Sequence, residues 1–266
     1  IFAALRDADI SIRKQALNML YGMCDRTNAQ EVVSELLDYL NNCEYSMREE
    51  LVLKIAILAE KFASDLSWYV DVMLVLVQQA GDFVAQDVWW RVVQIITNNP
   101  ELQSYASKTV YQALQAQLVS ETMLKIGAYV LGEFGGAIAG DISNSQQFET
   151  LHSRFATAQP ETRELLLTTY IKLAFRDGSV RPRALAVLQQ HTDNLDVELQ
   201  QRAVEYMLLA EQGGAGLLGK VLERMPPFPE RESSLVRIIK QRQQAATDKI
   251  PRKDGDAAAS AEHTEA

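Results

Sequence analysis

The glycine-rich run at residues 132–140 is the segment of this sequence that comes nearest to a nucleotide-binding motif. Gly135 and Gly140 have the separation of the two outer glycines of a phosphate-binding loop, in which backbone N–H groups surround the phosphates. Such a loop continues with Lys and then Ser or Thr, whereas Asp141 and Ile142 follow here. A carboxylate at that position would repel a phosphate, and no strand is expected before the run. The run therefore indicates the end of a helix and a loop between two helices.

The three histidines, His152, His191 and His263, are too scattered to predict a metal-binding or catalytic group. A histidine beside an aromatic residue, as His152 is near Phe155, is more often packed or at the surface than a catalytic base. No GxSxG, HExxH or comparable catalytic motif occurs. We therefore predict no catalytic residue, no metal site, no cofactor and no enzymatic activity.

The two cysteines, Cys24 and Cys43, stand alone, with no CxxC motif and no histidine nearby. Two reduced thiols in a cytosolic protein are the expected state, although the spacing alone leaves a disulfide open.

The net charge of −9 disfavours a nucleic-acid partner, because an acidic chain repels a phosphate backbone. The nearest approach to a basic patch is the short run of Arg237, Lys240 and Arg242. Three charges would bind an anionic membrane weakly, so a solvated helix face is the interpretation that we favour.

Apolar residues recur at helical spacing almost throughout the chain, of which 47% is hydrophobic. The pattern predicts helices of about 12 to 18 residues as far as about Gln243 and no sheet. Ser46 to Glu49 has the spacing of a capping box, and Pro100 fits a break near the start of a helix. The longest good candidate for an apolar run, residues 72–80, is far shorter than the roughly 20 residues that a membrane-spanning helix needs.

Internal similarity decides how these helices are arranged. The segment that begins at Asp9 resembles the one that begins at Asp196, and weaker echoes begin at residues 44, 82, 120 and 159. Successive starts are separated by 35, 38, 38, 39 and 37 residues. A near-constant period of two helices predicts an all-α fold, an α-solenoid of the HEAT or armadillo type with about six helical-hairpin repeats.

Two adjacent tryptophans, Trp89 and Trp90, are candidate contact residues. Neighbours on a helix point about 100° apart, so Trp89 lies nearer the apolar face and Trp90 nearer the polar flank. An aromatic residue on the polar flank could bind another protein. Packing between repeats is the interpretation that we favour, because solenoid helices bury two sides.

Composition divides the chain into a solenoid at residues 1–245 and a flexible, disordered linker at residues 246–266. The prolines at 226, 227 and 229 interrupt the helical pattern, and a last amphipathic helix is expected at residues 235–242. The apolar start, with Ile1, Phe2 and Leu5, predicts a solenoid that is incomplete at its N-terminus and exposes these side chains.

Seven blocks carry a resemblance to the alpha-adaptins, the large chains of the endocytic clathrin adaptor. They are residues 20–25 (LYGMCD), 45–50 (YSMREE), 68–71 (WYVD), 88–92 (VWWRV), 132–135 (GEFG), 194–206 (NLDVELQQRAVEY) and 225–234 (MPPFPERESS). The chain resembles the C-terminal part of the trunk of that family and the first residues of its hinge. The resemblance extends over nearly all of residues 1–240.

The resemblance implies a non-catalytic scaffold subunit of a heterotetramer that acts in clathrin-mediated endocytosis and intracellular protein transport. The implied partners are a second large chain, a medium chain and a small chain, with clathrin and accessory proteins bound through a hinge and appendage mostly absent here. The implied location is the cytosol and the cytoplasmic face of the plasma membrane, at clathrin-coated pits, with peripheral membrane association through the complex. No lipid-binding or cargo-binding residue is assigned, because the family's sites lie before this segment.

Two other interpretations stay open. The chain could be the large subunit of a Golgi or endosomal adaptor or of a coatomer-type coat, although the block at residues 225–234 favours the endocytic chain. It could also be a nuclear-transport-like HEAT-repeat protein that binds basic signals, although no regular array of Trp and Asn residues is present.

Overall fold

The computed structural model describes residues 1–212 and 214–229, in which every regular element is a helix. The first six α-helices are α1 (Ile10–Met23), α2 (Ala29–Leu40), α3 (Tyr45–Phe62), α4 (Leu66–Ala80), α5 (Gln86–Asn98) and α6 (Pro100–Leu114). The next six are α7 (Glu121–Phe134), α8 (Asn144–Phe155), α9 (Pro160–Arg176), α10 (Arg181–Gln190), α11 (Val197–Gln212) and α12 (Gly214–Val221). Three short 3-10 helices are η1 (Phe2–Arg6), η2 (Gly81–Phe83) and η3 (Gly135–Ile138). The predicted all-α fold is confirmed.

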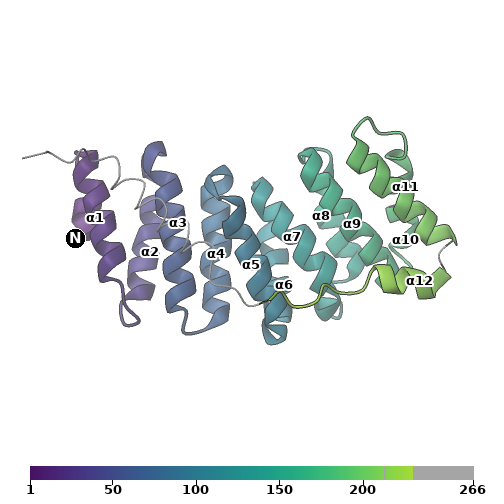
Figure 1. Cartoon of the computed structure of the whole chain (residues 1–266), viewed down its shortest axis with the longest axis horizontal. Coiled ribbons are helices and arrows are strands. Elements are labelled where there is room, and N and C mark those ends of the chain that lie inside the picture. Colours follow the sequence, from purple (N-terminus) through teal and green to yellow (C-terminus); the bar gives the residue numbers. More distant parts are fainter. Residues whose placement is uncertain (213, 230–266) are drawn as a thin grey trace, which may run out of the picture.

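The helices form an elongated array that runs from α1 at one tip to α11 and α12 at the other (Figure 1). Odd-numbered helices pack beside one another in one layer, as α5, α7, α9 and α11 do, and α2, α4, α6 and α8 form the second layer. Helices of the two layers pack on each other along the array, for example α2 on α3 and α6 on α7. This two-layered stack is the α-solenoid that the sequence period predicts.

The observed repeat agrees with the predicted one in five of six places. The odd-numbered helices α1 to α11 begin at residues 10, 45, 86, 121, 160 and 197, directly after the predicted starts at 9, 44, 120, 159 and 196. The predicted start at residue 82 is wrong. Gly81 ends α4 with a positive φ of 54°, and η2 follows before α5 begins at Gln86.

Side-chain caps fix several of these helix starts. Asp9 and Ser120 accept hydrogen bonds from backbone N–H groups of the first turns of α1 and α7. Pro100 is the first residue of α6, as predicted, because this position needs no backbone donor. The predicted capping box at Ser46 is wrong: α3 begins at Tyr45, and the residue at its cap position is Glu44, which lies two residues before Ser46 and makes no side-chain cap.

One continuous core runs between the two layers. Isolated helices of this length are marginal in water, so each repeat depends on the apolar face of its neighbour. The burial of Leu51 and Ile55 in α3 and of Tyr69 in α4 is complete. At the N-terminal tip, however, Leu5 is also buried, because η1 packs on α1. The predicted exposure is therefore wrong for Leu5, whereas Ile1 is 48% exposed.

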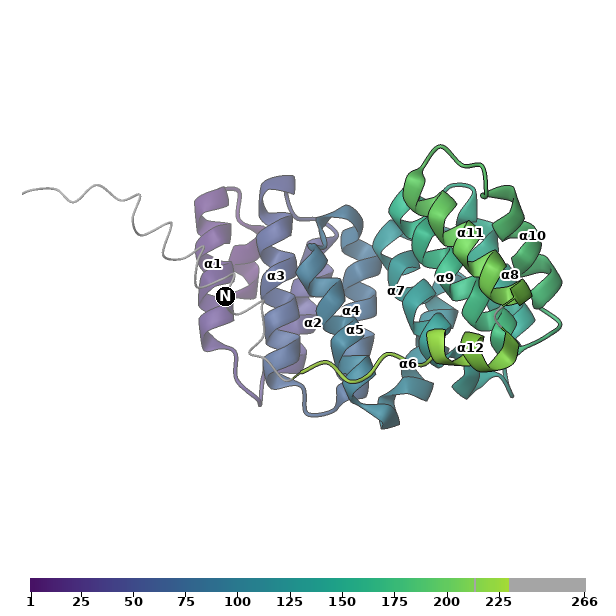
Figure 2. The same ribbon diagram turned by 45° about the vertical axis from the view of Figure 1, so that its right-hand side comes forward.

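After α12 the chain turns back along the solenoid. Residues 223–229, which we call the return segment, have no regular secondary structure and pass from α12 toward α5 (Figures 1 and 2). The predicted break at the prolines is therefore confirmed. The predicted helix at residues 235–242 and the predicted linker at residues 246–266 lie outside the described residues. Among the helices that the structure describes, none is both long and apolar enough for a membrane span.

Candidate interaction surfaces

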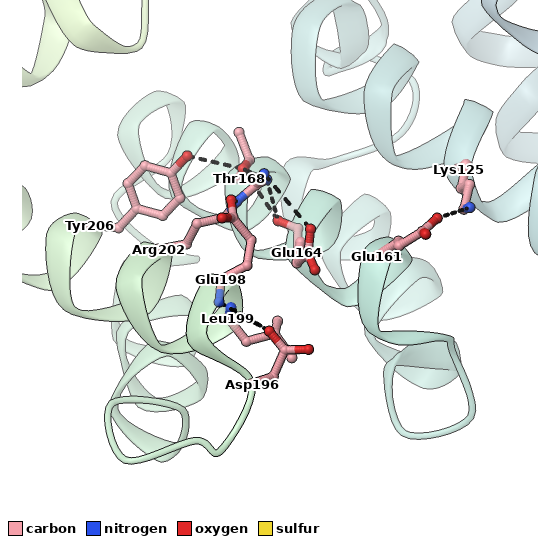
Figure 3. Close-up of polar contacts among 9 residues, drawn as sticks. All are labelled: Lys125, Glu161, Glu164, Thr168, Asp196, Glu198, Leu199, Arg202 and Tyr206. Atoms are coloured by element: carbon pink, nitrogen blue, oxygen red, sulfur yellow. Dashed lines mark hydrogen bonds and ion pairs between the residues drawn. The ribbon is translucent and has the colours of Figure 1, made fainter. Parts of the chain in front are cut away.

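A ladder of polar contacts joins helices that lie one repeat apart (Figure 3). Lys125 of α7 forms an ion pair of 2.9 Å with Glu161 of α9. The next step joins α9 to α11, where the hydroxyl oxygens of Thr168 and Tyr206 lie 3.0 Å apart. Arg202 of α11 also donates to the backbone carbonyl of Glu164, at 3.1 Å. These contacts fix the position of each repeat along its neighbour.

The same spacing recurs toward the N-terminal tip. Arg91 of α5 donates to Glu60 of α3 at 2.8 Å, and the Tyr105 hydroxyl of α6 donates to Asp71 of α4 at 2.9 Å. Arg13 of α1 pairs with Glu44 at the start of α3. Most of these groups are partly exposed, so each contact contributes little to stability and mainly sets the geometry of the rod.

Glu133, near the end of α7, is the centre of a buried polar cluster. Its carboxylate forms an ion pair with Lys172 of α9, and the two side chains are only 7% and 11% exposed. The second carboxylate oxygen accepts the backbone N–H of Met225 in the return segment, at 3.3 Å. Arg176 of α9 donates to the carbonyl of Leu131 at 2.7 Å. Burial lowers the pKa of Arg176 to about 10, and the nearby Glu133 opposes this shift.

A second contact joins the return segment to the end of α5. The side-chain amide of Asn98 donates to the carbonyl of Phe228 at 3.0 Å, and its oxygen accepts the N–H of Phe228 at 2.8 Å. The two residues are 130 positions apart in the sequence. Neither Asn98 nor Glu133 was predicted from the sequence. In the sequence, only the position of Glu133 within an otherwise uncharged stretch at residues 130–134 indicates that its carboxylate could be buried.

His152 belongs to an aromatic cluster and not to a catalytic group. Its ring stacks on Phe148, with centroids 5.2 Å apart, and lies 5.7 Å from Tyr170 and 5.9 Å from Phe155. His191 packs on the other part of this cluster, 5.2 Å from Phe155. The interpretation of His152 as a packed histidine is confirmed, and His263 lies outside the described residues.

We expect His152 to make the stability of the protein dependent on pH. Burial, with a smaller contribution from the positive charge of Arg183, lowers the pKa of His152. The pKa of His152 is therefore lower in the folded than in the unfolded chain, where it is about 6.5. At a pH above the pKa of the unfolded chain the neutral ring contributes fully to the stability of the fold. That contribution is lost as the pH falls through the pKa of the folded chain.

The comparison of the wild-type protein with His152→Gln tests this expectation. The variant has a side chain of similar size that does not titrate. The decrease in Tm between about pH 7.5 and pH 5 is expected to be smaller in the variant, with His191 and the carboxylates supplying the remainder. An equal decrease in both proteins would contradict a role for this histidine.

The glycine-rich run is a helix end, as interpreted from the sequence. α7 ends at Phe134 and η3 follows directly. A Cβ atom at Gly135 would lie 2.1 Å from the side-chain oxygen of the buried Gln147, so any other residue there would displace this side chain. The amide of Gln147 donates to the carbonyls of Gly135 and Ile142, at 3.0 and 2.9 Å. These glycines therefore serve the junction between α7 and α8.

The cysteines form no disulfide, as expected: Cys24 and Cys43 are both free and buried. Burial raises the pKa of each thiol, which keeps it protonated at neutral pH. Within residues 1–212 and 214–229, no three His, Cys, Asp or Glu side chains lie close enough together to hold a metal ion.

The two tryptophans differ in their surroundings. Trp89 is partly buried and packs against the core, as its predicted place nearer the apolar face requires. Trp90 remains 48% exposed, with its ring edge-on to Trp89 at 5.8 Å between centroids, so the interpretation as packing between repeats is wrong for this residue.

Both tips of the described solenoid expose apolar stripes. On α1 the exposed residues are Ile12, Met19 and Met23, at 45%, 46% and 59%. On α11 they are Val197, Val204 and Leu208, at 73%, 37% and 47%. An α-solenoid needs a polar face on its terminal repeats to remain soluble alone, so such stripes indicate surfaces that another element or chain covers.

Comparison with known proteins agrees with this architecture. The family model described as the adaptin N terminal region matches residues 1–214. A chain of "Homology model of the full-length AP-3 complex in an intermediate open conformation" superposes with a TM-score of 0.56. The match covers 90% of this chain and 49% of that one, at 17% sequence identity, and so supports the fold alone.

Several curated relatives are much more similar in sequence. AP-2 complex subunit alpha-1 of Arabidopsis thaliana is 50% identical over 243 residues, which are 89% of this chain and 24% of that protein. AP-2 complex subunit alpha-2 of Dictyostelium discoideum is 48% identical over 86% of this chain and 23% of its own length. AP-1 complex subunit gamma of the same organism is 32% identical over 88% of this chain and 28% of its own length. This chain thus spans about a quarter of the length of these relatives. By its fold, by the match over residues 1–214 and by these identities, the chain belongs to the adaptin family.

Proposed function

We propose that this chain acts as a non-catalytic scaffold in an endocytic clathrin adaptor complex. The observation that carries the proposal is the 50% identity to an AP-2 alpha subunit, against 32% to an AP-1 gamma subunit, over similar shares of this chain. We infer that residues 1–245 form the C-terminal part of the trunk and that residues 246–266 begin the hinge. The exposed stripe on α1, which another repeat would cover, supports this placement.

The proposed mechanism is geometric. Polar contacts one repeat apart hold the helices in a defined rod, and the apolar stripe on α11 provides a surface on which a neighbouring chain packs. The partners are a second large chain, a medium chain and a small chain, with clathrin and accessory proteins recruited through later parts of the large chain. The role requires no cofactor and no chemical step.

The proposed location follows from this assembly. The complex would lie on the cytoplasmic face of the plasma membrane, at clathrin-coated pits, and exchange with a cytosolic pool. Membrane association would be peripheral and would come from the complex, with no contribution assigned to residues described here.

Co-expression with partner chains tests the proposal. The chain is expected to co-purify in a stoichiometric complex with the second large, medium and small chains of an AP-2 complex, and less well with those of an AP-1 complex. Failure to enter either complex would refute the scaffold role. Preference for the AP-1 set would instead favour the Golgi or endosomal alternative.

A variant of the α11 stripe sharpens this experiment. Replacing Leu208 by Glu places a charge on a half-exposed apolar side chain, so we expect folding to persist and assembly to weaken. The matched control is Leu118→Glu, because Leu118 is 82% exposed and lies in the turn after α6, away from both stripes. Equal assembly of the two variants would exclude the α11 stripe from the interface.

A further inference from the structure

The return segment has few backbone donors, and the solenoid satisfies them. Between residues 225 and 229 only Met225 and Phe228 carry an N–H group, because the other three residues are prolines. The N–H of Met225 donates to Glu133 of α7, and the N–H of Phe228 donates to Asn98 of α5. The carbonyl of Phe228 accepts the side-chain amide of the same Asn98. Both N–H groups are therefore bound by side chains of distant helices.

The spacing of these two contacts matches an extended proline-rich chain. Each proline fixes its own φ. It also disfavours helical backbone angles for the residue before it, and these residues are Met225, Pro226 and Phe228. A polyproline II chain has three residues per turn, so positions 225 and 228 lie on one edge. The N–H groups of both positions donate to side chains of the solenoid, whereas the side chains of the three prolines are exposed.

Main-chain contacts, more than side-chain burial, hold the segment. Met225 is 46% exposed and Phe228 is only partly buried. The two residues that bind the main chain both belong to helices of the solenoid. Glu133 is fixed by its ion pair with Lys172, and Asn98 is the last residue of α5. A carboxylate fixed by an ion pair and an amide at a helix end can bind the main chain of an extended peptide without requiring particular side chains at most positions.

We propose that the ends of α5 and α7 form a binding site for the main chain of an extended, proline-containing peptide, and that the return segment occupies this site in cis. The site rests on contacts within the chain and does not depend on the proposed adaptor role. Occupation in cis fastens the sixth repeat to the third and restricts bending of the rod between them. A peptide with the same arrangement of prolines and donors binds when the return segment leaves.

Amide hydrogen exchange on the full chain tests occupation in cis. With selective ¹⁵N labelling of Met and Phe, the amides of Met225 and Phe228 are expected to exchange at least about tenfold more slowly than in an unstructured peptide. Asn98→Ala is expected to return the Phe228 amide to the unstructured rate. Gln86→Ala, an exposed change at the other end of α5, is expected to leave both rates unchanged.

A second variant distinguishes loss of the contact with Phe228 from general unfolding of the chain. Asn98→Asp keeps an acceptor for the N–H of Phe228 but loses the donor to its carbonyl, so the rate is expected to fall between those of the wild type and Asn98→Ala. Unstructured rates at both amides of the wild type would overturn the proposal. So would an unchanged Phe228 rate in Asn98→Ala.

Peptide binding tests the site itself. The full chain with residues 225–229 replaced by glycine and serine presents the site empty, and the probe is a fluorescent peptide with the sequence of residues 222–232. Anisotropy is expected to show binding to this chain that is at least about tenfold tighter than binding to the wild type, where the tethered segment competes at high effective concentration. Adding Asn98→Ala is expected to abolish the difference. Equal binding to all three proteins, or none to any, would overturn the proposal.

Discussion

Replacing Lys172 by Met is expected to lower the free energy of unfolding by about 3–5 kcal/mol, because the change leaves the carboxylate of Glu133 buried without its cation. Both partners of this ion pair are almost fully buried, and Glu133 also accepts the N–H of Met225. Removing the charge of Lys172 therefore weakens the contact between α7 and α9 and the attachment of the return segment. Urea unfolding followed by circular dichroism measures the first effect, and exchange of the Met225 amide measures the second.

Two controls separate this effect from a general loss of charge. In the double variant Lys172→Met with Glu133→Gln, no unpaired charge remains, so we expect recovery to within about 2 kcal/mol of the wild type. Lys108→Met breaks the exposed ion pair with Asp141, whose side chains are 53% and 69% exposed, and is expected to change stability by less than about 1 kcal/mol. A Lys172→Met variant no less stable than Lys108→Met would show that the buried pair has no special role.

Replacing Phe148 by Ala is expected to cost about 3–5 kcal/mol, because the cavity lies in a region that cannot easily collapse. Phe148 is 1% exposed, and its ring centroid lies 4.7 Å from that of Tyr170 and 5.2 Å from that of His152. Arg183 lies over the same ring, at 4.7 Å from its centroid. Loss of the Phe148 ring removes packing between α8 and α9 and removes one of the aromatic rings that surround His152.

The position of Phe148 makes the effect local as well as large. In a solenoid each repeat depends mainly on its neighbours, so hydrogen exchange is expected to increase in α8 and α9 well before α1 and α2. The pKa of His152 should also rise toward its usual value, as NMR titration would show. Phe175→Ala removes an aromatic residue that is 43% exposed and is expected to cost no more than about 1 kcal/mol. Uniform exchange along the array would contradict the expected local response.

The repeat architecture could be predicted from the sequence because each helix start repeats a local pattern. Capping residues such as Asp9, Ser120 and Asp196 precede an apolar face at nearly the same interval. The exception near residue 82 has a local cause that the period cannot show, since Gly81 and η2 lengthen one connection. The family could also be recognised from the sequence, because its matching blocks are spread between residues 20 and 234.

The polar clusters and the return segment could not be predicted in the same way. Glu133 and Met225 are 92 residues apart, and Asn98 and Phe228 are 130 apart, so no local pattern joins them. The prolines predicted that the helices end, but where an extended chain then lies depends on which side chains of the folded array face it. The exposure of Trp90 likewise depends on the angle between repeats, which the helical period leaves undetermined.

The path of residues 223–229 also changes where the described part of the chain ends. Phe228 is bound at the end of α5, so the last described residue, Pro229, is near the middle of the array and not at the α12 tip. Tension applied to the chain at Phe228 would act first on α5 through Asn98 and then on α7 through the contact of Met225 with Glu133, and it would reach α12 only after both contacts had broken.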